Sequence, residues 1–187
     1  DISGKRRTSP GRFLLPAFCD GNMEDIVVRL IGRFRWELCR TIQGVQWNDI
    51  KNKSLTSEYM DYLQFFKKNH ELSEEKKEKL KLQIQKARGN SREVFVVDYV
   101  TWVKFESQGS VRLNKIVREV MATYCPFNKE LRAKMAEQPL FAASTARFGR
   151  EHMKTLKELA MRRRALEKLG AKIPPELEKT YYFYEQM

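Results

Sequence analysis

SREVFVVDYVTWVKFE, residues 91–106, is the stretch that decides the fold class. Its β-branched and aromatic residues favour a strand by propensity. Its aromatic residues also recur at helical spacing, at Phe95, Tyr99, Trp102 and Phe105. The chain offers no second run of this kind with which a long strand could pair. We therefore predict a helix here, with a strand as the alternative.

Apolar residues at helical spacing predict further helices on both sides of this stretch. Capping residues precede these segments, and glycine or proline follows most of them. The predicted helices run from Asn22 to Gly44, from Thr56 or Ser57 to Lys68, from Ser73 to Gly89, from Ser110 to Tyr124, from Lys129 to Glu137 and from Pro139 to Gly170, with a final turn or two after Pro175. The fold class is therefore all-α, an irregular bundle of about seven or eight helices with a long basic C-terminal helix.

The length of 187 residues suits one domain with a projecting arm. Residues 1–13 predict a flexible basic lead-in, residues 14–137 a helical core, and residues 138–187 a long basic helix with an aromatic tail in the same domain. The chain begins with Asp1 and not Met, which suggests either a piece of a larger protein or a disordered start left out of the numbering.

The charge balance points to anionic partners. Lys and Arg number 36 against 24 Asp and Glu, a net charge of +12. A charge this far from zero attracts polyanions. No run approaches the roughly 18 apolar residues of a membrane span, so we expect no membrane partner. Cys19, Cys39 and Cys125 are odd in number and far apart, which favours reduced thiols and a cytoplasmic location.

Motifs for chemistry are missing from the sequence. His70 and His152 each stand alone, without the several converging ligands that a metal site needs. We therefore predict no catalytic residues, no metal and no cofactor. Asp98 is a single acid within an apolar run, and we expect it to form an ion pair with a nearby Arg or Lys because an unpaired buried charge is costly.

The first predicted helix carries a candidate surface for nucleic acid or another polyanion. Its members are Arg29, Arg33, Trp36 and Arg40. Arginines beside an aromatic ring suit phosphate contact with stacking on a base. The alternative is a solvated face on which Glu37 pairs with Arg33 and Arg40, while Trp36 packs on a neighbouring helix. The predicted core face of this helix is a separate set, Val27, Leu30, Ile31, Phe34, Leu38 and Ile42.

The last long helix adds a second candidate surface, Arg162, Arg163 and Arg164. Three consecutive residues span too wide an arc to lie on one face. The same region offers apolar positions at which a partner protein or a second copy could dock: Leu156, Leu159, Leu166, Tyr181 and Tyr184.

These features favour a non-enzymatic basic helical binding module, part of a larger intracellular protein, that contacts DNA, RNA or another polyanion mainly electrostatically. The first alternative is an interaction scaffold that docks a partner or forms a homo-oligomer through the long C-terminal helix. The second is an enzyme, because a pocket assembled from scattered residues leaves no pattern in a sequence.

Overall fold

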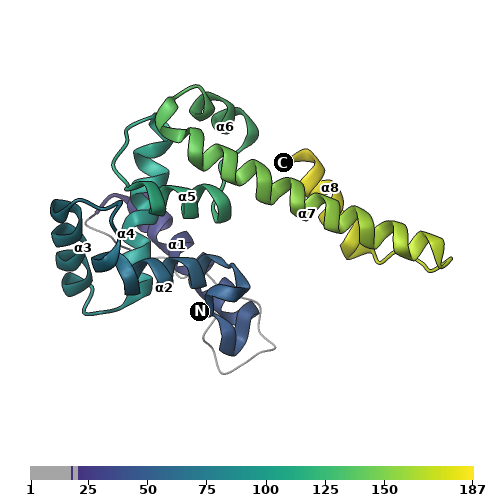
Figure 1. The fold of residues 1–187 in the computed structure, drawn as a ribbon, viewed down its shortest axis with the longest axis horizontal. Helices are drawn as coiled ribbons and strands as arrows, with labels where there is room; N and C mark the ends of the chain where they lie inside the picture. The colour runs from purple at the N-terminus through teal and green to yellow at the C-terminus, as the bar shows by residue number, and fades with distance from the viewer. Residues whose placement is uncertain (1–17, 19–20) are drawn as a thin grey trace.

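The chain folds into an all-α bundle in a computed structural model that describes residue 18 and residues 21–187 (Figure 1). Over this part the structure has eight α-helices and no strand, so the all-α prediction is confirmed. The helices are α1 (Met23–Gln43), α2 (Leu55–Phe65), α3 (Glu74–Lys86), α4 (Ser91–Lys104), α5 (Lys115–Tyr124), α6 (Lys129–Ala136), α7 (Ala142–Lys168) and α8 (Pro175–Gln186). The lead-in predicted for residues 1–13 and Cys19 lie outside the described residues, and the division at residue 137 stays a prediction.

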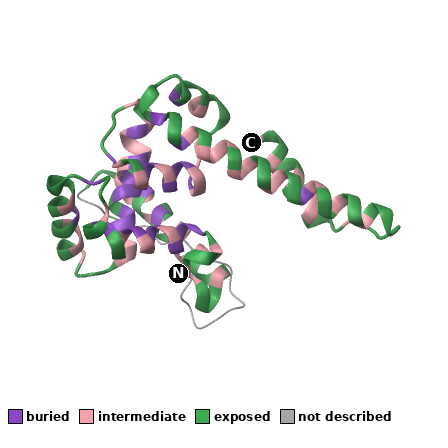
Figure 2. Ribbon diagram, in the orientation of Figure 1, coloured by how far each residue is buried: buried purple, intermediate pink, exposed green. Residues whose placement is uncertain are grey.

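Helix α4, the stretch that decided the fold class, lies among four other helices. It packs against α1, α2, α3 and α5, and Figure 2 shows the buried residues gathered around it. Its buried side chains are Val94, Phe95, Val96, Asp98, Tyr99, Val100 and Trp102. A helix covered on most sides needs apolar residues around its circumference. This explains why the sequence of α4 also suits a strand, and the helix prediction is confirmed.

Helix α1 meets α4 through a different face from the one predicted. Val28, Gly32 and Trp36 are buried, whereas Ile31, Leu38 and Ile42 are among the exposed hydrophobic residues. The reason is the close approach at Gly32, where an added Cβ would lie 2.9 Å from Cδ1 of Tyr99. A search for apolar periodicity passes over a glycine, so the predicted core face was wrong in part.

The helix starts are set by side-chain caps, several of them one or more residues from the predicted positions. Ser54 forms a capping box with Ser57 at the start of α2, and Asn90, not Ser91, caps α4. The helix predicted from Ser110 begins instead at Lys115, after Asn114 accepts a hydrogen bond from the backbone N–H of Val117. At both α4 and α5 an Asn is the cap where a Ser was predicted; Asn and Ser cap about equally well, so intrinsic preference does not choose between them.

A buried ion pair explains why α5 starts late. The Glu106 side chain is fully buried, at 0% exposure, in the 3₁₀ turn Glu106–Gln108 that follows α4. Its Oε1 accepts hydrogen bonds from the backbone N–H groups of Arg112 and Leu113, both at 2.7 Å. These bonds hold the connection in a non-helical conformation. Its Oε2 accepts from Nε of Arg118 on α5, also at 2.7 Å.

Arg118 extends this contact to the root of α7. It is 5% exposed and donates to the carbonyl oxygens of Leu113, at 2.7 Å, and Leu140, at 3.5 Å. Its guanidinium carbon lies 5.2 Å from the centre of the Phe141 ring. The Glu106–Arg118 pair therefore joins the α4–α5 connection to the 3₁₀ turn Pro139–Phe141, after which α7 begins.

Helix α7 leaves the bundle and continues into a projecting arm (Figure 1). It has 27 residues, a length of about 40 Å at the standard rise. It packs against α5 and α6 and, further along, against α8, which turns back beside it. Here the arm means residues 150–186. The predicted terminal turn or two is the 12-residue helix α8.

Candidate nucleic-acid interface

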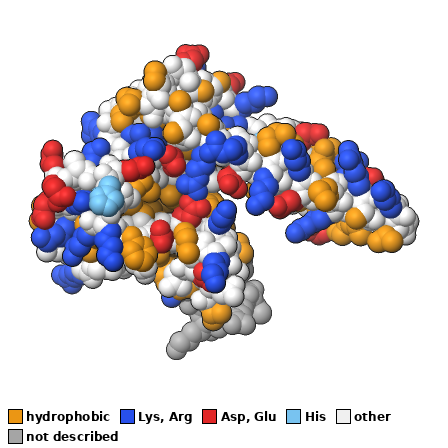
Figure 3. Space-filling model, in the orientation of Figure 1, with side chains coloured by type: hydrophobic (Ala, Val, Ile, Leu, Met, Phe, Trp, Pro, Cys, Tyr) orange, Lys and Arg blue, Asp and Glu red, His pale blue; other side chains and the backbone are white. Residues whose placement is uncertain are grey.

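The exposed side of α7 carries a row of cations at helical spacing. Successive steps of four and three residues keep side chains on one face of a helix. The members of this row, called here the α7 stripe, are Arg150, Lys154, Lys157, Arg164 and Lys168. All five are exposed, and Met161 occupies the remaining step between Lys157 and Arg164. Figure 3 shows basic side chains repeated along the arm.

The α7 stripe is exposed because α8 covers another side of α7. Arg163 lies over the ring of Tyr181, 5.3 Å from its centre. Nε2 of His152 lies 2.6 Å from the carbonyl oxygen of Tyr184, and the two rings stack with centres 5.9 Å apart. Positions 152 and 163 fall on the side of the helix away from the stripe, at 100° per residue. Helix α8 therefore leaves the cations in water.

No member of the α7 stripe forms an ion pair within the described residues. The acids of α7 itself are Glu151, Glu158 and Glu167, and the one with an ion pair, Glu167, accepts from Nε of Arg163 at 3.1 Å. That pair lies toward α8. Five positive charges thus remain along one face without a paired carboxylate.

The candidate surface on α1 is different from the one predicted. Trp36 is 2% exposed; its ring packs 5.3 Å from Phe95 and 5.9 Å from Tyr59, centre to centre. It cannot stack on a base, so its assignment as a contact residue was wrong. The alternative stated for Trp36, packing on a neighbouring helix, is correct. The reason is the one given above, the close approach of α1 to α4 at Gly32.

Two of the three α1 arginines are already close to acids. Arg33 donates from Nη2 to Oε2 of Glu93 at 2.8 Å and from Nε to Oε1 at 3.0 Å. These hydrogen bonds lower the pKa of Glu93. Arg40 lies 3.7 Å from a Glu37 oxygen and over the Trp47 ring. Arg29 is exposed and has no ion pair among the described residues. The α1 surface is therefore largely neutralised.

The triplet at 162–164 is divided between faces. Arg163 is held by Glu167 and Tyr181, whereas Arg162 and Arg164 are both exposed. Residues two apart do not face the same side of a helix, so only Arg164 belongs to the α7 stripe. The sequence reasoning picked out the compact triplet and missed the longer periodic row; a search for Lys and Arg at steps of three and four would have found it.

The predicted docking positions contact the same chain. Leu159 is buried, and Leu156 and Leu166 are half-buried. They flank the side of α7 on which Arg163 and His152 meet α8. Tyr181 and Tyr184 make those α8 contacts. The seam is therefore largely covered within the chain, and docking of a partner or a second copy at these five positions stays a prediction.

Asp98 has hydrogen-bond donors in place of the expected ion pair. Its Oδ2 accepts from the Tyr59 hydroxyl at 2.6 Å, and its Oδ1 accepts from Nε2 of Gln83 at 3.0 Å. No Arg or Lys pairs with it in the described part of the chain, so that prediction was wrong. Removal from water raises the pKa of Asp98. Neutral donors on two helices satisfy the carboxylate without a second buried charge.

The surroundings of Asp98 do not assemble a catalytic group. A cavity of about 360 Å³ beside Asp98 is lined in part by Lys79 and Arg112, yet the two carboxylate oxygens already accept hydrogen bonds from Tyr59 and Gln83.

Other groups for chemistry are also unsuited to it. Burial raises the pKa of the Cys125 thiol to about 11, so it is a poor nucleophile at neutral pH. No group of three or more His, Cys, Asp or Glu side chains able to hold a metal occurs in the described residues.

Fold and surface together define an all-α protein with a projecting, positively charged arm. The model of a family described as a domain of unknown function (DUF8509) matches residues 44–184, and the chain belongs to that family. The matched region contains the whole α7 stripe and begins after α1. Comparison with curated proteins and with solved structures gives no match. Among the described residues, no helix has both the length and the apolar composition needed to cross a membrane.

Proposed function

We propose that this protein is a non-enzymatic helical module that binds DNA or RNA through the phosphate backbone, with the α7 stripe as its contact surface. The observation that carries the proposal is the row of five exposed cations, none of them in an ion pair within the described chain. Cations that face water gain little from isolated surface acids, but a polyanion releases its counterions when it meets them together.

The length of the α7 stripe suits a linear polyanion. From residue 150 to residue 168 the helix rises about 27 Å. Phosphates on one strand of B-DNA are spaced by about 3.4 Å along the axis, so the stripe spans about eight of them. The helix that carries the row is already folded and packed against α8, so its backbone does not have to become ordered on binding.

The contacts offered by the stripe favour binding without sequence preference. Phosphate contacts position a protein on nucleic acid, whereas base contacts specify sequence. Lysine, which makes up three of the five stripe positions, acts as a point charge toward phosphate. The aromatic side chain expected to stack on a base, Trp36, is in the core. Affinity should therefore depend on salt much more than on base composition.

A lipid surface is a less suitable partner than nucleic acid. A helix that lies on a membrane combines cations with an open apolar face. The apolar side of α7 faces α5 near the bundle and α8 along the arm. Met153 and Met161 on the arm part of α7, and Leu169 at its end, are exposed, but each step of eight residues turns by about 80° around the helix, so they do not form one continuous apolar face beside the cations. On α8, Tyr182 and Phe183 are also exposed.

We place the module inside the cell, in the cytoplasm. Cys39 and Cys125 are free thiols in the described structure, which suits a reducing compartment. The two residues belong to α1 and to the end of α5 and do not form a disulfide.

Fluorescence anisotropy tests the proposal, with a labelled duplex of about 20 base pairs and the matching single strand as probes. The variant Lys154→Gln/Lys157→Gln/Lys168→Gln removes three charges from the α7 stripe. The matched control, Lys51→Gln/Lys67→Gln/Lys86→Gln, removes three exposed lysines elsewhere and leaves the same net charge. We expect the stripe variant to bind roughly 10- to 100-fold more weakly at about 0.1 M salt, and the control to bind nearly as the natural chain does.

Two results would overturn the proposal. Equal losses in the stripe and control variants would mean that net charge alone, and not this surface, attracts the nucleic acid. Binding to vesicles of anionic lipid with none to either nucleic acid would assign the stripe to a membrane. Circular dichroism of each variant checks that its helical content is unchanged.

A further inference from the structure

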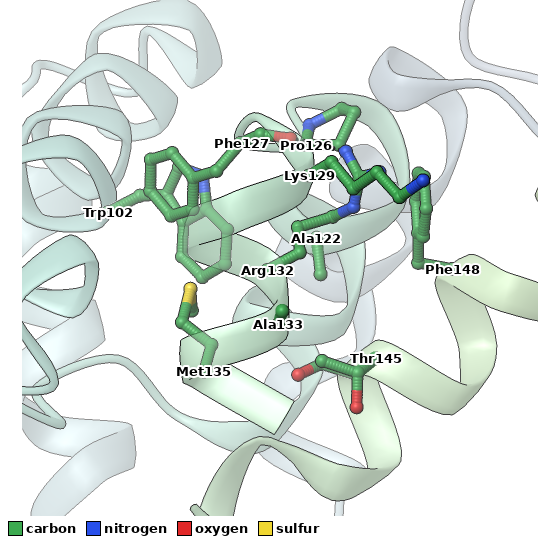
Figure 4. Close-up of a pocket in the computed structure, with 11 residues that line it drawn as sticks. Trp102, Ala122, Pro126, Phe127, Lys129, Arg132, Ala133, Met135, Thr145 and Phe148 are labelled. Carbon is green, nitrogen blue, oxygen red and sulfur yellow. Dashed lines mark hydrogen bonds between the residues drawn. The ribbon is translucent and has the colours of Figure 1, made fainter. Parts of the chain in front are cut away.

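A largely apolar cavity lies between α5, α6 and the start of α7, separate from the α7 stripe. Its volume is about 270 Å³. Figure 4 shows Trp102 and Phe127 toward one end and Phe148 toward the other, with Ala133 between them. The Trp102 and Phe127 rings are stacked with centres 4.6 Å apart and planes 15° apart. This end of the cavity is therefore aromatic, formed by a stacked pair in which Trp102 is almost fully buried.

The neutral polar groups in the wall already have partners. The Ser144 hydroxyl donates to the Phe141 carbonyl at 2.8 Å, and the Thr145 hydroxyl lies 3.0 Å from the same oxygen. Nε1 of Trp102 donates to the carbonyl of Cys125 at 2.9 Å. These groups do not require a polar ligand atom. Toward a ligand, this part of the cavity is apolar.

Two cationic side chains in the cavity wall have hydrogen-bond donors that are not used within the chain. Lys129 and Arg132, both on α6, line the cavity on the side of Phe148 (Figure 4). The Arg132 guanidinium lies 4.5 Å from the centre of the Phe148 ring and donates to main-chain oxygens of Phe127 and Met187. That uses two of its five N–H groups, and Lys129 has three more donors. Neither pairs with a carboxylate side chain in the described chain.

The charge at this end is incompletely compensated. Burial lowers the pKa of Arg132 because the guanidinium is partly removed from water. Two main-chain oxygens offset only part of the desolvation of a cation. An anion beside Arg132 and Lys129 would supply the missing charge, and a carboxylate matches the planar fork of a guanidinium.

We infer that this cavity is a binding site for a small aromatic monocarboxylate, with the ring against Trp102 and Phe127 and the carboxylate at Lys129 and Arg132. The size sets the ligand class. A cavity of about 150 Å³ accommodates a benzene ring, so 270 Å³ suits a two-ring acid of about 10 to 13 non-hydrogen atoms. The inference concerns a different surface from the α7 stripe and stands independently of nucleic-acid binding.

Isothermal titration calorimetry with 2-naphthoate tests the site. We expect saturable binding to one site per chain with a Kd no weaker than about 1 mM, the affinity of an ordinary ligand of this size. The neutral probe 2-naphthalenemethanol has almost the same shape without the charge. It should bind about tenfold more weakly, because its hydroxyl carries no negative charge to pair with Lys129 and Arg132. The Trp102 indole N–H resonance should shift with 2-naphthoate in nuclear magnetic resonance spectra.

Three variants place the ligand. Lys129→Ala should weaken 2-naphthoate binding about three- to tenfold, whereas Lys134→Ala, on the same helix but outside the cavity, should leave it within about twofold. Ala133→Leu adds three carbon atoms to the wall and should abolish binding, since the cavity has little spare volume. Lys129, Ala133 and Lys134 are exposed, so these variants should keep the fold.

The inference fails if 2-naphthoate shows no saturable binding at millimolar concentration, or if the neutral alcohol binds equally well. It also fails if Lys129→Ala and Lys134→Ala lose the same affinity, because the charge would then act from a distance and not at the cavity. In each case the nucleic-acid affinity of the α7 stripe is measured separately and need not change.

Discussion

Breaking the buried Glu106–Arg118 pair should destabilise the protein strongly. In Glu106→Gln the shape of the side chain is kept, and its oxygen can still accept from the backbone N–H groups of Arg112 and Leu113. The new amide nitrogen, however, stands where a carboxylate oxygen accepts from Nε of Arg118 at 2.7 Å. Two donors then face each other, and the guanidinium loses its anion.

The expected cost is about 3 to 5 kcal/mol, the usual effect of removing one partner of a buried pair. Both side chains are almost fully buried, Glu106 at 0% and Arg118 at 5% exposure, so solvent screening does little to reduce it. Domains of this size have a free energy of unfolding of about 5 to 15 kcal/mol. The corresponding fall in Tm is about 6 to 20 °C.

Urea unfolding followed by circular dichroism measures this loss, and a double-variant cycle isolates the pair. In Glu106→Gln/Arg118→Met no unpaired guanidinium remains, so the double variant should be more stable than the sum of the two single losses predicts, by about 1 to 3 kcal/mol. A loss below about 1 kcal/mol in Glu106→Gln, or strictly additive losses, would refute the reasoning, because either result means that the pair does not carry the connection.

Three further predictions concern the packing and titration of the bundle. Because folding raises the pKa of Asp98, its ionisation should destabilise the folded protein as the pH rises above 3.8, its ordinary pKa. In urea titrations the free energy of unfolding of Asp98→Asn, relative to that of the natural chain, should therefore rise over that range. A fall would contradict the burial argument. Because Arg33 lowers the pKa of Glu93, Arg33→Ala should reduce the free energy of unfolding by about 0.2 to 1 kcal/mol at neutral pH. This reduction should vanish as the pH falls through the folded-state pKa of Glu93, and a reduction that persists in acid would indicate lost packing instead. Gly32→Ala should lower stability by about 1 to 3 kcal/mol, measured by thermal unfolding, because the new methyl group meets the Tyr99 ring; an unchanged Tm would show that the ring can move aside.

The helices could be predicted from the sequence because the features that determine a helix lie close to it along the chain. Apolar spacing, caps and glycine stops lie within a few residues of the structure they determine, which is why α4 was assigned correctly despite its strand-like composition. What failed depends on contacts between distant residues. The face that α1 presents is chosen by Gly32 meeting Tyr99, and the start of α5 is delayed by Glu106, whose partner Arg118 lies 12 positions away.

For the candidate site, too, local features could be predicted from the sequence, whereas contacts between distant residues could not. That the surface would be basic could be predicted from composition, but which cations stay unpaired could not. Arg33 is paired with Glu93, 60 positions away in the sequence, and so is not free to bind a phosphate. Trp36 lies in the core because it packs against aromatic rings on α2 and α4. The α7 stripe itself is a local periodic pattern and was accessible to sequence reasoning. Its exposure depends on where α8 packs, which only the fold shows.

The salt dependence of nucleic-acid binding by the natural chain tests the central claim most directly. If the five cations of the α7 stripe each contact one phosphate of a duplex, the logarithm of the affinity should fall against the logarithm of the salt concentration with a slope of about −4.5. A slope shallower than about −1, or no binding even at about 50 mM salt, would contradict a contact surface made of that row.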